Sequence, residues 1–282
     1  MRPEPVMSTD LGAATTTVTD QMGRVIAVPN RPQRIVSLVP SQTELLFDVG
    51  LDREIVGVTE YCVHPAECVG AKQRVGGTKR LDLEAIDRLR PDLIIGNKEE
   101  NSRDDVLKLA ESYPVWMSDV VTLADACDMI HQVGRLVGKP DTAGGLAKQI
   151  EAAFAELQPL ARPLRVGYFI WQKPFMVAGR DTFITDILNR CGMENAFAAT
   201  SDGRYPRVSV DDIVAAKLDA ILLSSEPFPF GTRHRIAFAE QFPGVAAHMV
   251  DGEMFSWYGS RLLLAVDYLR DRLTILAGSV DR

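Results

Sequence analysis

The amino-acid sequence predicts an α/β protein of two similar lobes with mainly parallel sheets, bridged by one long helix, with a ligand cleft between the lobes. The length of 282 residues suits two lobes of ordinary size better than one small core. Both halves of the chain carry the same order of short apolar runs and amphipathic segments. Between the halves, a segment flanked by prolines has helical periodicity. We therefore expect four parts: an N-terminal segment with a β-hairpin (1–33), an N-terminal α/β lobe (34–139), the bridging helix (140–160) and a C-terminal α/β lobe (161–282).

The N-terminal half opens with two β-rich stretches around Gln21-Met22-Gly23, which predict a hairpin. The apolar run Arg34–Val39 then predicts a buried strand. Ser41 followed three residues later by Glu44 has the pattern of a capping box, so we expect a helix to begin there and to end at Gly50. The further elements that we expect in this half are Ile55–Val58, Leu83–Leu89, Leu93–Gly96, Asp104–Ser112, Val115–Met117 and Leu123–Val137.

The C-terminal half repeats this order. Leu83–Glu99 matches Val210–Glu226 without gaps at an offset of 127 residues, and both segments read as a helix, a turn and a strand. The alternative is that any two helix–turn–strand units look alike. The elements expected in this half are Arg165–Ile170, Asp181–Arg190, Val210–Ala216, Ala220–Ser224, His248–Val250 and Leu262–Leu276.

The predicted bridging helix lies between Pro140 and Pro159. Its apolar residues recur at the spacing of one helical face: Leu146, Ile150, Phe154 and Leu157. A helix of this length spans roughly 25 Å and is stiff, unlike a glycine- and serine-rich linker.

Composition excludes several classes of function. The formal net charge of −7 argues against nucleic acid or an anionic membrane surface as the main partner. No apolar run is long enough for a transmembrane helix, and Met1–Thr17 lacks the apolar core of a signal peptide. The chain is therefore either a form without its leader or a cytoplasmic protein. The motifs of zinc peptidases, serine hydrolases and dinucleotide-binding enzymes are absent, which favours binding without catalysis and without a cofactor.

The four cysteines are too sparse for a disulfide scaffold. We expect separate thiols, with Cys127 and Cys191 buried in helices. A bridge between Cys62 and Cys68 is the open alternative.

Several stretches together resemble one known family. They are the run from Arg34 to Gly50, the Arg90-Pro91-Asp92-Leu93-Ile94-Ile95 segment and the Gly192-Met193-Glu194-Asn195-Ala196-Phe197 segment. In this order and spacing they resemble the helical-backbone periplasmic binding proteins, which capture cobalamin, ferric siderophores and haem for ABC importers. The resemblance covers about residues 17–280 and is closest to the cobalamin-binding branch. It implies two α/β lobes on one long helix and a small opening motion.

The resemblance also implies partners. In the cobalamin branch, one glutamate on each lobe docks into arginine pockets of the permease, and the matching positions here are Glu44 and Glu194. The alternatives are that Glu44 only completes its capping box and that Glu194 is a solvated loop charge. The implied partners are therefore a permease with its ATPase and a small-molecule ligand, with the protein itself a periplasmic monomer.

A corrinoid or chelate is large and partly flat, so its site needs aromatic surface with a few polar anchors. Four loops at the ends of predicted strands, where ligands of open α/β sheets bind, carry such residues. Their alternative role is to pack the lobe edges or to seal the lobes together. The candidate ligand contacts are Tyr61, Cys62, His64, Trp171, Phe175, Phe228, Trp257, Tyr258 and Arg261, with Tyr205 as an addition.

His64, two residues from Cys62, is also a candidate metal ligand, including for a metal carried by the ligand, although a loop histidine is also typical of a surface role. Lys79 and Lys98 occupy positions that, by the resemblance to the cobalamin branch, would belong to an aromatic-lined cleft. This departure favours a ligand with anionic groups, for which the two lysines are the countercharges; the alternative is that both lysines are simply solvated.

Three functional hypotheses follow. The first is a capture protein of an ABC importer. The second is a cytoplasmic carrier or sensor of a corrinoid or tetrapyrrole. The third is a chelatase-like enzyme in which His64, Glu99 and Glu226 act as acid–base groups.

Overall fold

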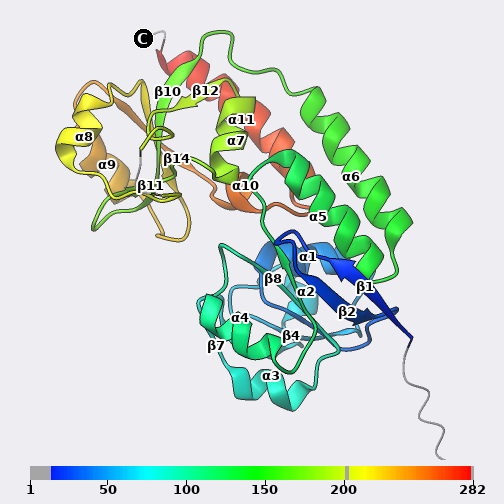
Figure 1. The fold of residues 1–282 in the computed structure, drawn as a ribbon. Coiled ribbons are helices and arrows are strands. Elements are labelled where there is room, and N and C mark those ends of the chain that lie inside the picture. The colour runs from blue at the N-terminus through cyan, green and yellow to red at the C-terminus, as the bar shows by residue number, and fades with distance from the viewer. Residues whose placement is uncertain (1–13, 201–202, 281–282) are drawn as a thin grey trace, which may run out of the picture.

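A computed structural model describes residues 14–200 and 203–280 and has the two-lobed α/β architecture that the sequence predicts (Figure 1). Most of Met1–Thr17, where a signal peptide was not expected, lies outside the described residues, as do the last two residues of the predicted C-terminal lobe. Among the helices that are described, none combines the length and the apolar character needed to cross a membrane.

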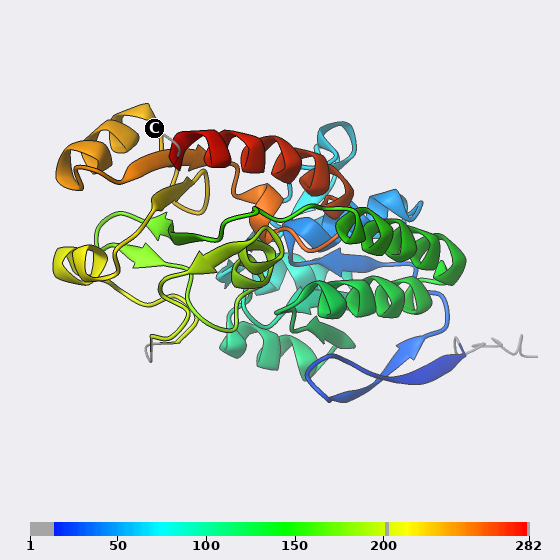
Figure 2. The ribbon, with the colours of Figure 1, turned by 90° about the horizontal axis from the view of Figure 1, so that it is seen from above.

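The N-terminal hairpin pairs β1 (Thr15–Thr19) with β2 (Val25–Pro29) in antiparallel register. Its turn uses Gly23 at a positive φ of 75°, which favours glycine. Arg24 in this hairpin forms an ion pair with Asp20 at 2.7 Å and also donates to the Val115 carbonyl at 2.9 Å. The hairpin is therefore tied to the N-terminal lobe, at whose margin it lies in Figure 2.

The N-terminal lobe is built on a five-stranded parallel sheet of order β5-β4-β3-β8-β9. Its central strands are buried on both faces, which is why they read in the sequence as continuous apolar runs. The elements of this lobe are β3 (Ile35–Ser37), α1 (Pro40–Asp48), β4 (Ile55–Val58), α2 (Ala66–Val69), β5 (Gln73–Arg74), β6 (Gly76–Gly77), β7 (Arg80–Leu81), α3 (Leu83–Leu89), β8 (Leu93–Asn97), α4 (Arg103–Ala110) and β9 (Val115–Ser118).

The C-terminal lobe has a second sheet of order β11-β10-β13-β14, with β12 also pairing β10. All its pairings are parallel except that of β11. The elements of this lobe are β10 (Leu164–Trp171), β11 (Met176–Val177), α7 (Phe183–Arg190), β12 (Met193–Asn195), α8 (Val210–Ala215), β13 (Ala220–Ser224), α9 (Thr232–Gln241), β14 (Ala246–Val250), α10 (Glu253–Ser256) and α11 (Leu262–Val280).

The internal repeat is visible in the backbone. The unit α3–β8 in the first lobe corresponds to α8–β13 in the second, at the predicted offset. Arg90 and Lys217 are equivalent under that offset, and both have left-handed backbone angles, with φ of 46° and 49°. A non-glycine residue is uncommon in this conformation, so its recurrence at one position of each unit indicates structural equivalence and not chance similarity.

Side-chain contacts repeat as well. Asp92 accepts a hydrogen bond from the backbone N–H of Arg34 at 2.8 Å, and Asp219 accepts one from that of Arg165 at 2.7 Å. Each arginine then donates from Nε to a carbonyl at the end of its own lobe's repeat helix, at 2.8 Å and 2.7 Å. These bonds hold the start of the first strand of each lobe against the turn before the neighbouring strand.

The bridging helix α6 (Pro140–Ala155) runs from the N-terminal to the C-terminal lobe and packs along α5 (Leu123–Leu136), as both views show (Figures 1 and 2). It ends at Ala155, before the predicted limit of 160. Its buried face includes the predicted Ile150 and Phe154 and also Ala143 and Ala147, while the predicted Leu146 is partly buried. Small residues let the two helices approach closely, since a Cβ on Gly134 of α5 would lie 2.3 Å from that of Ala143.

Helix α5 also reaches the second lobe. The backbone N–H of Leu123, at its first turn, donates to the Asp186 carboxylate of α7 at 2.8 Å. The C-terminal helix α11 packs on α6 from the side of the second lobe. The connection between the lobes is therefore a layer of packed helices and not a single bridging helix. The sequence pattern did not reveal the helices that pack against α6.

Candidate ligand site between the lobes

Residues that follow the strands of one lobe contact residues that follow the strands of the other. Arg204 of the second lobe binds Glu99 at 3.0 Å and Asp119 at 3.1 Å, and these two carboxylates follow β8 and β9. Ligands of open α/β sheets bind at the carboxyl ends of the strands. The interface between the lobes is thus the candidate ligand site. In this structure ion pairs between charged side chains connect the two lobes there.

Arg261 is at the centre of a buried ion-pair cluster. It donates to both carboxylate oxygens of Glu44, at 2.8 Å and 2.6 Å, and lies 3.0 Å from Glu253. Its guanidinium also lies 5.0 Å from the centroid of the Trp257 ring. Arginine provides the planar fork that such a bidentate contact needs. Arg261 was predicted to contact ligand, but these contacts occupy it as a clamp between the lobes.

Glu44, the first predicted docking residue, is mostly buried and paired with Arg261 in this arrangement, and its docking role remains a prediction. Only 12% of its side chain is exposed, because the loop that carries Arg261 covers it. Burial raises the pKa of this carboxyl, while the bonds from Arg261 oppose that shift. The alternative explanation of Glu44, the capping box, is wrong: Val39 is the residue before the first helical turn, and Pro40 begins the helix.

His64 links the same cluster to the first lobe. Its Nε2 lies 3.1 Å from Glu253, and its ring meets the Trp257 ring edge-on with centroids 5.5 Å apart. Among the described residues, no group of three or more His, Cys, Asp or Glu side chains could hold a metal ion. The predicted metal-ligand role of His64 therefore finds no support in its contacts, which are those of an inter-lobe hydrogen bond.

Cys62 is not a ligand contact. It is fully buried, and its sulfur lies 3.1 Å from the Thr43 hydroxyl and 3.2 Å from that of Thr59. Burial raises the pKa of this thiol. All four cysteines are free, which rules out the Cys62–Cys68 bridge and confirms the expectation of separate thiols.

The two predicted countercharges are bound to the protein itself. Lys98 forms an ion pair with Asp119, and Lys79 donates to the backbone carbonyl of Glu99. Burial opposes ionisation of Asp119, but the bonds from Lys98 and Arg204 lower the pKa of its carboxyl overall. In this arrangement both lysines therefore have partners within the protein, and their role as countercharges to an anionic ligand remains a prediction.

The carboxylates near them are the groups that sequence reasoning undervalued. Glu100 is half-buried, and burial followed by the charge of Glu99 raises the pKa of its carboxyl to about 7. Burial also raises the pKa of Glu226, although Ser256 and Trp257 donate to its Oε1 at 2.8 Å and 3.0 Å. The coincidence of Glu99 and Glu226 in the repeat was the available signal, since it placed one glutamate at the end of each equivalent strand.

The predicted aromatic contacts separate into exposed and buried groups. Trp171 is 39% exposed and packs edge-on against Phe228 with centroids 5.4 Å apart, and Tyr61 is exposed on the first lobe. Tyr205 is half-buried, and burial and the neighbouring Glu99 raise the pKa of its phenol well above the usual value. These rings lie at the ends of strands, as predicted.

Trp257 and Tyr258 form the buried group, with Phe175 partly buried. Phe175 packs in the core of the second lobe, with its ring 5.3 Å from that of Phe238. Trp257 and Tyr258 are buried between the lobes, as the alternative of a sealing role anticipated. A Cβ on Gly259, next in the chain, would lie 2.6 Å from the Ser41 carbonyl of α1, so this loop presses directly on the first lobe.

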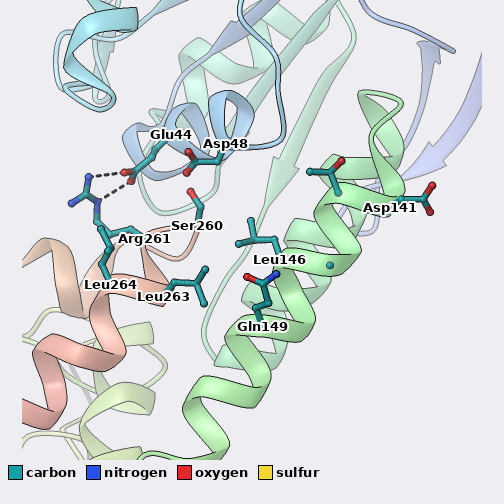
Figure 3. A pocket seen from close by; sticks show the side chains of 11 residues that line it. Glu44, Asp48, Asp141, Leu146, Gln149, Ser260, Arg261, Leu263 and Leu264 are labelled. Carbon is teal, nitrogen blue, oxygen red and sulfur yellow. Dashed lines mark hydrogen bonds and ion pairs between the residues drawn. The ribbon is translucent and has the colours of Figure 1, made fainter.

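A pocket lies at a different place, beside the bridging helix (Figure 3). It measures about 650 Å³ and is lined from α1, α6 and the start of α11. Figure 3 shows Glu44 paired with Arg261 at one end of it and Asp141 at the other, with Leu146 and Leu263 between them. None of the exposed aromatic residues lines it, so we place the ligand site at the strand ends and not here.

Glu194, the second predicted docking residue, is on the surface. It belongs to β12, is 60% exposed and pairs with Arg165. Its docking role remains a prediction.

The fold and this interface define a class: a two-lobed binding protein with its site between parallel sheets. A family model described as Periplasmic binding protein matches residues 35–244, and the chain belongs to this family. A curated relative, the Vitamin B12-binding protein of Pectobacterium carotovorum subsp. carotovorum (strain PC1), is 28% identical over 256 residues, covering 87% of this chain and 90% of its own.

Solved structures share the fold. The periplasmic Vitamin B12 binding protein BtuF of Vibrio cholerae aligns with a TM-score of 0.74 at 24% identity, covering 88% of this chain and 99% of that one. The periplasmic heme-binding protein RhuT from Roseiflexus sp. RS-1 aligns with a TM-score of 0.75 at 24% identity, covering 87% and 99%. The chain is about equally similar to these two structures, and at this level of identity the similarity shows a shared fold only.

Proposed function

We propose that this chain is the substrate-binding protein of an ABC importer and that it captures cobalamin or a related corrinoid between its lobes. The observation that carries the proposal is the similarity, across 87% of the chain, to a relative named for vitamin B12 binding. Exposed aromatic rings and hydrogen-bonding groups at the facing strand ends provide the kind of surface that a large, partly flat ligand needs.

The test is isothermal titration of the purified protein with cobalamin, dicyanocobinamide, haem and a panel of ferric siderophores. We expect saturable one-to-one binding of the corrinoids. Trp171→Ala, which removes an exposed ring, weakens that binding about 10-fold or more. Ile236→Ala, an exposed apolar residue on α9, is the control and leaves it unchanged. A folded protein that binds none of these compounds contradicts the proposal.

We further propose that Glu194 contacts the permease. Its present pair with Arg165 is exposed, and such pairs contribute about 0–1 kcal/mol, so the carboxylate can exchange partners at little cost. In reconstituted vesicles, Glu194→Lys is expected to abolish stimulation of the importer's ATPase while ligand affinity stays unchanged. Full stimulation by this variant contradicts the docking role.

The compartment proposed is the periplasm, where capture for an importer takes place. Fractionation of the native gene product tests this. Recovery in the cytoplasmic fraction contradicts an import role and favours the carrier or sensor hypothesis.

A further inference from the structure

Three carboxylates from both lobes act on one region of the interface. Glu99 and Glu100 follow β8 in the first lobe, and Glu226 follows the equivalent strand β13 in the second. Burial and the charges of Glu99 and Glu226 raise the pKa of the Glu100 carboxyl, and the charge of Lys79 only partly opposes that shift. Like charges gathered in such a place are costly unless something compensates them.

The cations nearby do not compensate all of them. Arg204 is divided between Glu99 and Asp119, Lys98 pairs with Asp119, and Lys79 donates to a backbone carbonyl. Within the described residues, no ion pair and no side-chain hydrogen bond reaches the Glu100 carboxylate. The site therefore has hydrogen-bond-accepting capacity that the protein does not use.

The Glu226 carboxylate also has hydrogen-bond-accepting capacity that the protein does not use. Its Oε1 accepts from both Ser256 and Trp257, which fix the orientation of the carboxylate. No described residue donates to Oε2. The carboxylate is thus held in place by one oxygen, and the other is available to a donor on a ligand.

Tyr258 supplies an independent sign that a ligand belongs here. Its side chain is only 6% exposed, and its buried hydroxyl has no hydrogen-bond partner of acceptable geometry in the described part of the chain, although the Ser41 hydroxyl lies close enough to lower the pKa of this phenol. Among charged groups, Glu100 and Glu99 act on this phenol most strongly, so the hydroxyl belongs to the same region. An unpaired buried hydroxyl is unfavourable, and a ligand atom that bonds to it removes that cost.

We propose that Glu100, Glu226 and Tyr258 select the ligand by the groups on its rim, accepting a macrocycle that carries neutral primary amides and rejecting one that carries carboxylates. An amide N–H₂ donates to the free carboxylate oxygens, and its carbonyl can accept from the tyrosine hydroxyl. A ligand carboxylate instead meets like charge and leaves these acceptors unpaired, which is how sites discriminate strongly. This inference rests on the proposed corrinoid capture and names the chemical class within it.

The test uses two corrinoids that share the same ring and axial ligands: dicyanocobinamide, whose rim carries amides, and dicyanocobyrinic acid, whose rim carries carboxylates. Binding is measured by isothermal titration at about pH 8, above the pKa of Glu100. We expect the amide corrinoid to bind at least about 100-fold more tightly. The Glu100→Gln/Glu226→Gln double variant should reduce this ratio to about 10-fold or less, mainly by gaining affinity for the acid.

Glu111→Gln, on the surface beyond α4, is the matched charge control and should keep the full ratio. Equal or tighter binding of the carboxylate corrinoid by the unmodified protein overturns the inference while corrinoid capture stands. An unchanged ratio in a folded double variant also overturns it. If neither corrinoid binds the folded protein, the proposed function itself fails.

Discussion

Glu100 makes a direct prediction about how stability depends on pH. Its carboxyl has a pKa of about 7 in the folded protein, compared with an ordinary value of 4.5. This difference of about 2.5 units, at 1.36 kcal/mol per unit, sets an upper limit of about 3.4 kcal/mol. Because the side chain is only half-buried, solvent screening reduces the expected effect to about 2 kcal/mol.

The sign follows from the direction of the shift. The folded state favours the neutral acid, so this contribution to stability is fully present below about pH 4.5 and is lost as the pH rises through about 7. Gln cannot ionise, so Glu100→Gln is expected to be more stable than the unmodified protein by about 2 kcal/mol at about pH 8, and of similar stability at about pH 4.

Urea denaturation followed by circular dichroism at a series of pH values measures this difference. The slope of the free energy of unfolding against urea should be the same for both proteins, so that the midpoints report stability. Glu111→Gln is again the control for loss of an exposed charge. Equal stabilities at high pH, or a gain that appears only at low pH, would refute the reasoning.

Two further predictions concern packing. Arg261→Met leaves the buried Glu44 carboxylate without its partner and is expected to cost about 3–5 kcal/mol in urea denaturation, whereas adding Glu44→Gln restores much of the loss. A double variant as unstable as the single one would contradict this. Gly134→Ala forces α5 away from Ala143 and should lower stability by about 1–3 kcal/mol. Its counterpart Gly145→Ala, on the open side of α6, should instead raise it by about 0.5–1 kcal/mol, and a loss there would contradict the packing described.

The fold was predictable because its signals are local or periodic. The order of strands and helices follows from short apolar runs and their spacing, and the repeat followed from Asp92 and Asp219 at equivalent positions. The large residues of the buried face of α6 were predicted, since Ile150 and Phe154 are buried and Leu146 is partly so. The alanines that pack closely against α5 were not predicted, because that partner is not evident from the segment itself.

The site was less predictable, because its chemistry depends on pairs far apart in the chain. Glu44 and Arg261 are 217 residues apart, and nothing in the sequence near either residue indicates that the two form an ion pair. Likewise, whether Lys98 is free depends on Asp119 in the next strand loop. The sequence predicted loops at the strand ends as the site, but only the three-dimensional arrangement shows which charged groups have partners within the protein.

The recurrence of left-handed Arg90 and Lys217, with their matching arginine–aspartate bonds, has an evolutionary consequence. It is the pattern expected if the two lobes arose by duplication of one unit, in which case the two sides of the interface would begin with identical groups. Such a pair would favour a symmetrical molecule. The present halves differ at the decisive position, where Glu99 is followed by a second glutamate and Glu226 by a proline. The two facing sides of the interface therefore present different groups, two neighbouring carboxylates on one side and a single carboxylate on the other.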